Sequence, residues 1–119
     1  MRKKGGEGCM NYLDKYIITN KNSKFYGRHA WLIDMPDEND RARFIVDSGV
    51  KLRMKMSSVK FVSPRFPEGY RFRDRMFGAE YVITRINWSH DKYRAKYNDA
   101  LWEVALYPWN VPEQKAKVV

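Results

Sequence analysis

Hydrophobic and basic residues alternate without interruption in the segment VKLRMKM at residues 50–56. The even positions hold valine, leucine and methionine, and the odd positions hold Lys51, Arg53 and Lys55. Successive side chains of a β-strand point to opposite faces, so this spacing predicts a strand with one apolar face and one basic face. The basic face is either an ordinary solvated exterior or a binding surface.

Strand-like runs of this kind recur through the middle of the chain. Helical periodicity is weak except around residues 12–16, so the pattern predicts a mainly β protein with short turns. The runs are KYIIT (15–19), AWLIDM (30–35), RARFIV (41–46), VKLRMKM (50–56), VKFVS (59–63), YRFRD (70–74), EYVITRINW (80–88), KYRAKY (92–97) and LWEVALY (101–107).

A weak internal repeat appears when the sequence is aligned with itself at a shift of 51 residues. Its turns and its hydrophobic alternation align together, which favours a tandem repeat over a chance match between two β-meanders. The matching segments are KFYG (24–27) with RMFG (75–78), DRAR (40–43) with DKYR (91–94), and DSG (47–49) with NDA (98–100).

The repeat divides the chain into two halves, 11–62 and 70–109, joined by the linker SPRFPEG at 63–69, whose prolines suit a central strand poorly. Residues 1–10 and 110–119 are expected to be flexible tails. Each half is short for an independent domain, so we expect the halves to pack together through large aromatic residues. These aromatics are Trp31, Trp88, Trp102 and Tyr107.

Turn chemistry predicts how the strands pair. A three-residue DSG loop with Gly49 in the left-handed conformation pairs Phe44 with Leu52 and makes one face of the hairpin apolar. A two-residue loop would mix apolar and charged side chains on both faces. With the three-residue loop, the other face of the hairpin pairs Ile45 with Lys51, Arg43 with Arg53, and Arg41 with Lys55. In the second half the apolar pairs are Tyr97 with Trp102, Ala95 with Val104, and Tyr93 with Leu106.

The chain is basic, with 23 lysine and arginine residues against 14 aspartate and glutamate residues and a formal net charge of +9. This balance favours a polyanionic partner. Like charges directly opposite on paired strands cost up to about 1 kcal/mol per pair, and neither strand of the first hairpin carries an acidic residue on that face. A purely solubilising surface would more often mix positive and negative charges, so the pattern favours phosphate contact, for which arginine provides forked donors.

In the second half, Glu103 lies opposite Lys96 and weakens the case for phosphate contact. The candidate phosphate-contacting residues are Arg41, Arg43, Lys51, Arg53, Lys55, Lys60, Arg65, Arg71, Arg73, Arg75, Lys92, Arg94 and Lys96.

Aromatic residues in the neighbouring loops are candidates for stacking on bases or sugars, although such residues more often fill the core. They are Phe25, Tyr26, Phe66 and Phe77. In LYPWNVP at 106–112, Tyr107 and Trp109 flank a proline and are candidate anchors of a protein interface; the alternative is that they close the fold.

The segment DKYIITNKNSKFYGRHAWLID (14–34) resembles a KOW segment, with a short strand, a loop closed by an aromatic residue and Gly27, and a strand of alternating hydrophobic residues. KOW segments lie in small SH3-like barrels of ribosomal proteins, transcription elongation factors and some phage DNA-binding proteins. The resemblance implies tandem SH3-like β-barrels packed together, or one fused β-structure of two such halves. It assigns Gly27, and Gly78 by the internal match, as turn glycines, as turn chemistry does for Gly49.

The sequence contains little that indicates a catalytic or a metal-binding site. Cys9 has no second cysteine to pair with, and His29 and His90 lie far from any nucleophile pattern. The acidic segment DMPDEND at 34–40 lacks the glycine and terminal glutamate of a calcium loop, and KKGGEG at 3–8 precedes no strand-to-helix turn. We therefore expect no enzyme activity, no catalytic or metal-binding residues, no cofactor, no small-molecule substrate and no membrane span.

Charge, pattern and resemblance together predict a basic module that binds DNA or RNA through the phosphate backbone, largely without sequence specificity. Such a module would act in transcription, in translation or in phage modulation of a host, in the cytoplasm and with the nucleoid if its partner is DNA. The alternative is a small interaction protein, of viral type, that inhibits or redirects a host protein such as a polymerase or nuclease.

Overall fold

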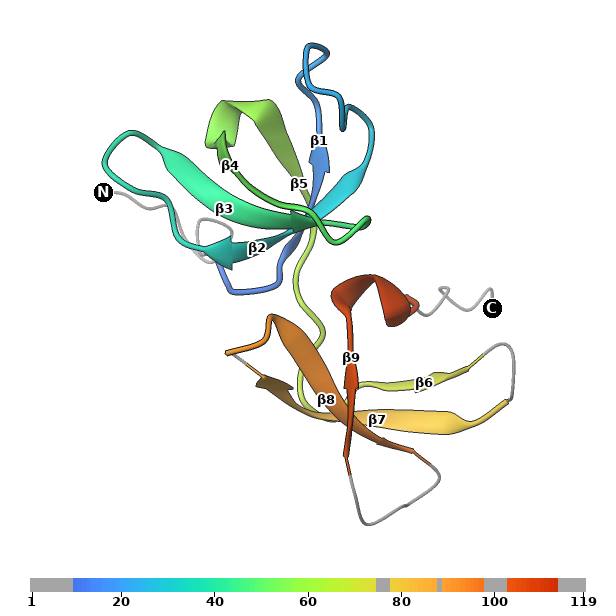
Figure 1. The fold of residues 1–119 in the computed structure, drawn as a ribbon. Helices are drawn as coiled ribbons and strands as arrows, with labels where there is room; N and C mark the ends of the chain where they lie inside the picture. The colour runs from blue at the N-terminus through green and yellow to red at the C-terminus, as the bar shows by residue number, and fades with distance from the viewer. Residues whose placement is uncertain (1–9, 75–77, 88, 98–102, 114–119) are drawn as a thin grey trace, which may run out of the picture. The chain divides into compact units, whose positions relative to one another are not determined.

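The computed structural model describes residues 10–74, 78–87, 89–97 and 103–113. The chain divides into two compact units, Met1–Arg65 and Phe66–Val119. Each unit contains one antiparallel sheet, of five and four strands respectively (Figure 1), so the predicted mainly β class is confirmed. A strand lies within or overlaps every predicted strand-like run, because alternating apolar positions give each run one face to bury.

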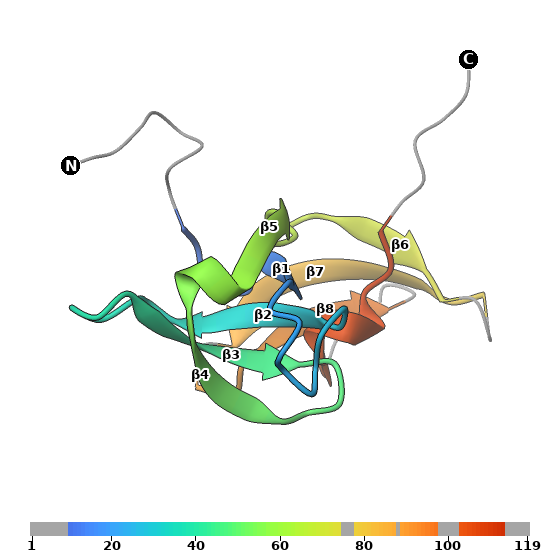
Figure 2. The same cartoon turned by 90° about the horizontal axis from the view of Figure 1, so that it is seen from above.

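The first unit is a five-stranded sheet with the order β4-β3-β2-β1-β5. The short 3₁₀ turn η2 (Met56–Ser58) joins its two end strands, as Figures 1 and 2 show. The strands are β1 (Lys15–Ile18), β2 (His29–Asp34), β3 (Arg41–Val46), β4 (Lys51–Lys55) and β5 (Val59–Ser63).

Neither sheet is a closed barrel within the part of the chain that the structure describes, in contrast to the barrels that the sequence suggested. In the first unit, β4 pairs only with β3 and β5 only with β1. The physical reason lies in η2, where the Val59 N–H donates to the Met56 carbonyl and the chain turns locally instead of forming a hairpin. β4 and β5, which this turn connects, therefore do not pair with each other.

The β3–β4 hairpin has the predicted register. Phe44 pairs with Leu52 and Arg43 with Arg53 across the strands, which confirms the three-residue loop. Gly49 adopts φ +91°, a conformation that costs a residue with a Cβ, and its N–H donates to the Val46 carbonyl at 2.7 Å. The apolar positions then form the core of the unit, with Tyr16, Ile18, Ala30, Leu32, Ala42, Phe44, Val46, Met54 and Val59 buried together.

The second unit is a four-stranded sheet with the order β6-β7-β8-β9. The predicted pairs Tyr93 with Leu106 and Ala95 with Val104 are confirmed, while Trp102, the predicted partner of Tyr97, lies outside the described residues. Tyr93, Ile83 and Ala95 are buried. The elements are β6 (Arg71–Arg73), β7 (Glu80–Asn87), β8 (Lys92–Tyr97), β9 (Val104–Leu106) and the 3₁₀ turn η3 (Pro108–Asn110).

The pairing of β7 with β8 reproduces that of β2 with β3 at the shift of 51 residues. Leu32 pairs with Phe44 as Ile83 pairs with Ala95, and the register shift after Leu32 recurs after Ile83. The glycines at the ends of the preceding loops, Gly27 and Gly78, both have positive φ. The correspondence does not extend to the first strand, because residues 66–69, which would match β1, form no strand.

The ends of the two units differ from the predicted boundaries. β5 continues through Ser63, and the Arg65 N–H donates to the carboxylate of Asp14, so residues 63–65 belong to the first unit and not to a linker. In the second unit Val111 is buried and the Tyr70 hydroxyl donates to the Pro112 carbonyl at 2.7 Å. Packing therefore extends past residue 109, because the apolar Val111 follows directly on η3. The proposed aromatics Trp88 and Trp102 lie outside the described residues.

Alkaline pH should destabilise the first unit through Tyr16. Burial, together with the charge on Asp14, raises the pKa of Tyr16 from 10.0 to about 12. A group whose pKa is raised by folding contributes stability below its unfolded pKa and loses it as pH rises through the folded value. We therefore expect the free energy of unfolding to fall between pH 10 and pH 12, by on the order of 1–2 kcal/mol from this group.

Urea unfolding at pH 9 and pH 11.5 measures this loss. Tyr16→Phe should lose less stability than the wild type over the same interval, whereas Tyr26→Phe, at a site where the ring is 52% exposed, should lose as much as the wild type. Equal losses in all three proteins would show that Tyr16 is not responsible.

Candidate nucleic-acid interface

Five cationic side chains lie on one face of the β3–β4 hairpin. They occupy the odd positions of both strands, because the even positions turn into the core. Arg41 lies opposite Lys55 and Arg43 opposite Arg53, as predicted. We call this surface the basic hairpin face: Arg41, Arg43, Lys51, Arg53 and Lys55, all exposed except the half-buried Arg43.

An acidic side chain from outside the two strands reaches this face. Asp37, in the turn between β2 and β3, lies 3.5 Å from the Arg53 guanidinium. Both side chains are about 40% exposed, so the ion pair is weak. Within the described part of the chain, no carboxylate forms an ion pair with Arg41, Arg43 or Lys55. The face is therefore less isolated from acidic groups than the strand pattern suggests, but it keeps a large excess of positive charge.

Asp37 is held in place by the turn that it starts. Its carboxylate accepts hydrogen bonds from the backbone N–H groups of Asn39 at 2.8 Å and Arg41 at 3.1 Å. The hydrogen bond from Arg41 and then that from Asn39 hold the pKa of Asp37 below its usual value, with further lowering by the charges of Arg53 and Arg41. Asp37 therefore stays ionised, and its position at the edge of the hairpin is fixed by the backbone.

The other candidate cations of the first unit lie apart from the hairpin. Lys60 is exposed on β5, which is separated from β3 by two strands in the sheet order. Arg65 is half-buried, and its guanidinium donates to the Tyr12 carbonyl at 3.5 Å. The basic hairpin face is thus the main cationic surface that the first sheet brings together.

Most candidate cations of the second unit have partners within the protein. Arg71 lies 3.9 Å from Glu80, and the Arg73 guanidinium donates to the Gly78 carbonyl at 2.6 Å. Lys92 lies over the ring of Tyr107, 4.5 Å from its centroid. Lys96 is half-buried, and Arg75 lies outside the described residues. The second sheet therefore presents less unpaired charge than its sequence suggests.

Glu103 neutralises two arginines of the second sheet. Its carboxylate lies 3.4 Å from both the Arg85 and the Arg94 Nε and accepts a 2.6 Å hydrogen bond from the Thr84 hydroxyl. The Thr84 hydrogen bond, and then those interactions with Arg94 and Arg85, hold the pKa of Glu103 below its usual value. The sequence placed Glu103 against Lys96. The β8–β9 register agrees with that placement, since Ala95 pairs with Val104. The carboxylate nevertheless interacts with Arg94 and with Arg85, which lies opposite Arg94 on β7.

The candidate stacking residues differ in exposure. Phe25 packs against the core of the first unit, and Phe66 stacks on Tyr70 with ring centroids 4.4 Å apart. Tyr26 is exposed in the loop between β1 and β2. Phe77 lies outside the described residues. Of the described candidates, Tyr26 alone is available to a ligand without rearrangement of packing.

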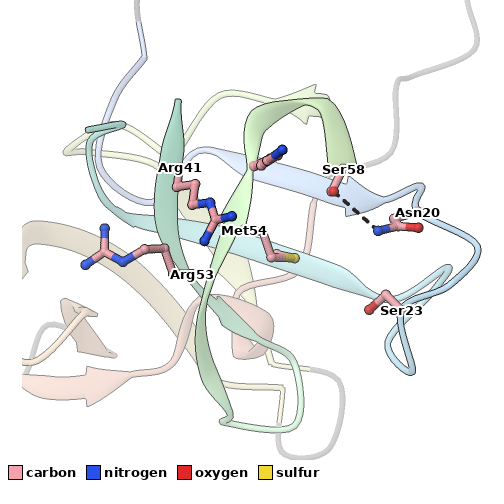
Figure 3. Close-up of a pocket in the computed structure, with 7 residues that line it drawn as sticks. Asn20, Ser23, Arg41, Arg53, Met54 and Ser58 are labelled. Carbon is pink, nitrogen blue, oxygen red and sulfur yellow. Dashed lines mark hydrogen bonds between the residues drawn. The ribbon is translucent and has the colours of Figure 1, made fainter. Parts of the chain in front are cut away.

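An open pocket of about 340 Å³ lies beside the hairpin. Figure 3 shows Met54 at its centre, with Arg41 and Arg53 on one side and polar side chains of the β1–β2 loop and η2 on the other. Sequence analysis did not identify these polar residues, because their loop and turn come together only when β1 pairs with β5. The lining residues are Asn20, Ser23, Arg41, Arg53, Met54, Lys55 and Ser58.

Tyr107 and Trp109 form a stacked pair at η3, with ring centroids 4.7 Å apart and planes at 7°. Tyr107 is 42% exposed, whereas Pro108 between them is buried. The proline anchors the turn, so the exposed Tyr107 ring is held in a fixed position.

Comparison with known proteins gives no further guide: no model of a protein family and no curated protein matches the sequence. None of the described residues forms a helix long and apolar enough to cross a membrane. The described residues also contain no group of three or more histidine, cysteine, aspartate or glutamate side chains placed to hold a metal ion.

Proposed function

We propose that the first unit is a nucleic-acid-binding module that contacts the phosphate backbone through the basic hairpin face. The observation that carries the proposal is the concentration of five cations on two paired strands. Among the described residues, no carboxylate forms an ion pair with Arg41, Arg43 or Lys55. Direct opposition of like charges costs free energy in the folded protein, and an anionic partner offsets that cost. Three of the five are arginines, which suit the forked geometry of phosphate oxygens.

The sheet itself supports the same function. A five-stranded antiparallel sheet with a 3₁₀ turn before its last strand is compatible with the SH3-like architecture that the KOW resemblance implies, and the register repeats in the second unit. Lysine and arginine side chains at regular spacing along two strands suit contact with successive phosphates, and such contacts carry no direct sequence information. We therefore propose binding to DNA or RNA with little sequence preference, in transcription, translation or phage modulation of a host.

Replacing Lys51, Arg53 and Lys55 together with glutamine should weaken nucleic-acid binding by a similar factor on unrelated sequences, because phosphate contacts carry no direct sequence information. Each lost contact to duplex DNA should also reduce the slope of log affinity against log salt by about 0.9, so the slope should fall by up to about 2.7. Folding stability should hold or rise, because Arg43 would no longer face a second arginine. Fluorescence anisotropy titrations over a series of salt concentrations measure both effects.

A matched control removes the same charge from the second unit. Arg71, Arg73 and Arg85 each interact with a carboxylate or a carbonyl, so the triple glutamine variant at these positions should lose less affinity. Unchanged affinity and slope in the hairpin variant would refute the proposal. A larger loss in the control would move the binding surface to the second unit.

One observation supports the alternative of a protein partner. The stacked Tyr107–Trp109 pair presents an exposed aromatic ring of the kind that anchors protein interfaces. A partner held by these residues should remain bound in a pull-down after nuclease treatment and should be lost in the Tyr107→Ala variant, whereas a complex bridged by nucleic acid should be lost on nuclease treatment.

A further inference from the structure

We propose that the pocket beside the hairpin binds one unpaired nucleotide, so that the first unit prefers single-stranded nucleic acid to a duplex. The phosphate would lie on the cationic side of the pocket and the sugar or base on its polar side. This inference rests on the proposed function, since it assigns a substrate class to the same surface. Four observations carry it: the charge of the lining, the hydrogen bonds that it offers, its size and its apolar centre.

The cationic side of the pocket is built from paired strands. Arg41 and Lys55 are register partners on β3 and β4, and Arg53 precedes Lys55 by two positions on the same face. No carboxylate is among the residues that line the pocket. Asp37 interacts with Arg53 from outside it. Three cations line one side of the pocket and no carboxylate lines it, which favours an anion with several oxygens, as a phosphate has.

The opposite side of the pocket offers mainly hydrogen-bond donors. The Ser23 Oγ already accepts from the Phe25 N–H at 3.0 Å, which directs its own O–H toward another acceptor. Asn20 Oδ1 likewise accepts from the Asn22 N–H at 2.9 Å, and its amide makes only a long 3.5 Å contact with the Ser58 hydroxyl. The pocket therefore suits a ligand rich in acceptors, such as the carbonyl oxygens, ring nitrogens and sugar oxygens of a nucleotide.

The size and centre of the pocket favour a nucleotide over a phosphate alone. A volume of about 340 Å³ lies at the lower end of the range of small-molecule sites, roughly 300–1,000 Å³. Met54 lies between the cationic and polar sides (Figure 3), and a polarizable thioether packs well against an aromatic ring. A bare phosphate would engage the cations but would not reach the polar side chains on the other side of the pocket.

The preference for single strands follows from the geometry of the nucleic acid. In a duplex each base is paired and stacked, and a nucleotide enters a pocket only after the free-energy cost of unpairing and unstacking. In a single strand the bases splay out at little cost. Phosphate contacts on the open hairpin face are available to both forms. The pocket thus adds affinity for single strands alone.

The test compares a variant with a negative charge added inside the pocket and a control variant with the same charge added outside the pocket. Asn20→Asp keeps the Oδ1 acceptor of the turn and adds a negative charge on the polar side of the pocket, which would face the sugar or base. Asn22→Asp makes the same change at an exposed residue two positions away that does not line the pocket. The probes are a fluorescein-labelled 12-nucleotide single strand of mixed sequence and the 12-base-pair duplex formed from it, at one ionic strength.

We expect Asn20→Asp to weaken binding of the single strand by about tenfold and of the duplex by less than about threefold. The added carboxylate would repel the acceptor oxygens and the phosphate of a nucleotide inside the pocket, whereas solvent screens it from duplex phosphates on the open hairpin face. Asn22→Asp should change both by less than about threefold. Ser58→Ala, which adds no charge, should lower single-strand affinity by about threefold to tenfold through the lost hydrogen bond, while Ser57→Ala should not. Urea unfolding establishes that each variant is folded.

The remaining outcomes separate this inference from the proposed function. Equal effects of Asn20→Asp and Asn22→Asp would overturn the pocket, and the hairpin proposal would stand if the Lys51, Arg53 and Lys55 variant still bound weakly. Equal weakening of single strand and duplex by Asn20→Asp alone would show a phosphate contact and no nucleotide site. Full affinity in every variant, the hairpin variant included, would overturn both.

Discussion

Replacing Phe44 with alanine should lower the free energy of unfolding of the first unit by about 3–5 kcal/mol, the usual cost of removing a buried phenylalanine. Phe44 is fully buried at the centre of the core on β3, and Tyr16 packs edge-on against it with ring centroids 5.4 Å apart. Its loss would leave a cavity directly beneath the strand that carries Arg41 and Arg43. Binding to nucleic acid should therefore fall together with stability.

Phe61 provides the matched control for this change. It packs on Tyr16 in nearly the same edge-on geometry, at 5.7 Å, but it is 50% exposed on β5. Phe61→Ala should therefore cost about 1 kcal/mol or less. Urea unfolding of the two variants compares the same substitution, phenylalanine to alanine, at a buried and at an exposed site. If the alanine variant at 44 does not fold, Phe44→Leu should still lose more stability than Phe61→Ala; the reverse order would contradict the core as described.

Replacing Asp14 with alanine should lower the free energy of unfolding by about 3 kcal/mol, because two backbone donors would lose their acceptor in a buried place. The Asp14 carboxylate is 1% exposed and accepts from the N–H groups of Asn11 at 2.8 Å and Arg65 at 2.9 Å. It thus ties the first turn of the unit to its last residue. It also holds the turn in which the buried Leu13 adopts φ +71°, a strained conformation for leucine.

Asp34 is the control for charge and composition. It lies exposed at the end of β2, and Asp34→Ala should change stability by no more than about 0.5 kcal/mol. Asp14→Asn should fall between the two, because one amide oxygen can replace only part of the carboxylate. Hydrogen exchange at the Arg65 amide measures directly whether its hydrogen bond to Asp14 is formed. We expect faster exchange in the alanine variant, and unchanged exchange would show that Asp14 does not hold this end of the chain.

The turn at Gly49 shows why the hairpin could be predicted from the sequence. A strict alternation on both strands allows only registers that keep apolar residues together, and the choice between a two-residue and a three-residue loop then determines the register. The observed pairs of Phe44 with Leu52 and Arg43 with Arg53 follow from these local constraints alone. The same reasoning gave the pairs of Tyr93 with Leu106 and Ala95 with Val104 in the second unit.

The ion pairs show where such reasoning fails. The sequence contains Asp37 and Glu103 but does not show that Asp37 reaches Arg53 across a turn or that Glu103 interacts with Arg85 and Arg94 and not with Lys96. Long side chains reach diagonal neighbours and residues of adjacent turns or strands, so the register alone does not determine which charges meet. The two basic strand faces therefore look alike in sequence and differ in the charge that they present.

The sequence by itself determined the mainly β class, the nine strands found among the described residues, the register of both hairpins and the position of the basic hairpin face. Alternation and turn chemistry act between residues close along the chain, which is why these features could be predicted. Only the tertiary structure decided that the sheets stay open, that Asp14 joins residues 11 and 65, and that Asn20 and Ser58 come together beside Arg41 and Lys55. These features depend on pairing between β1 and β5, strands more than 40 residues apart in the sequence. Contacts at that separation leave no periodic pattern in the chain, since each depends on the packing of the whole unit.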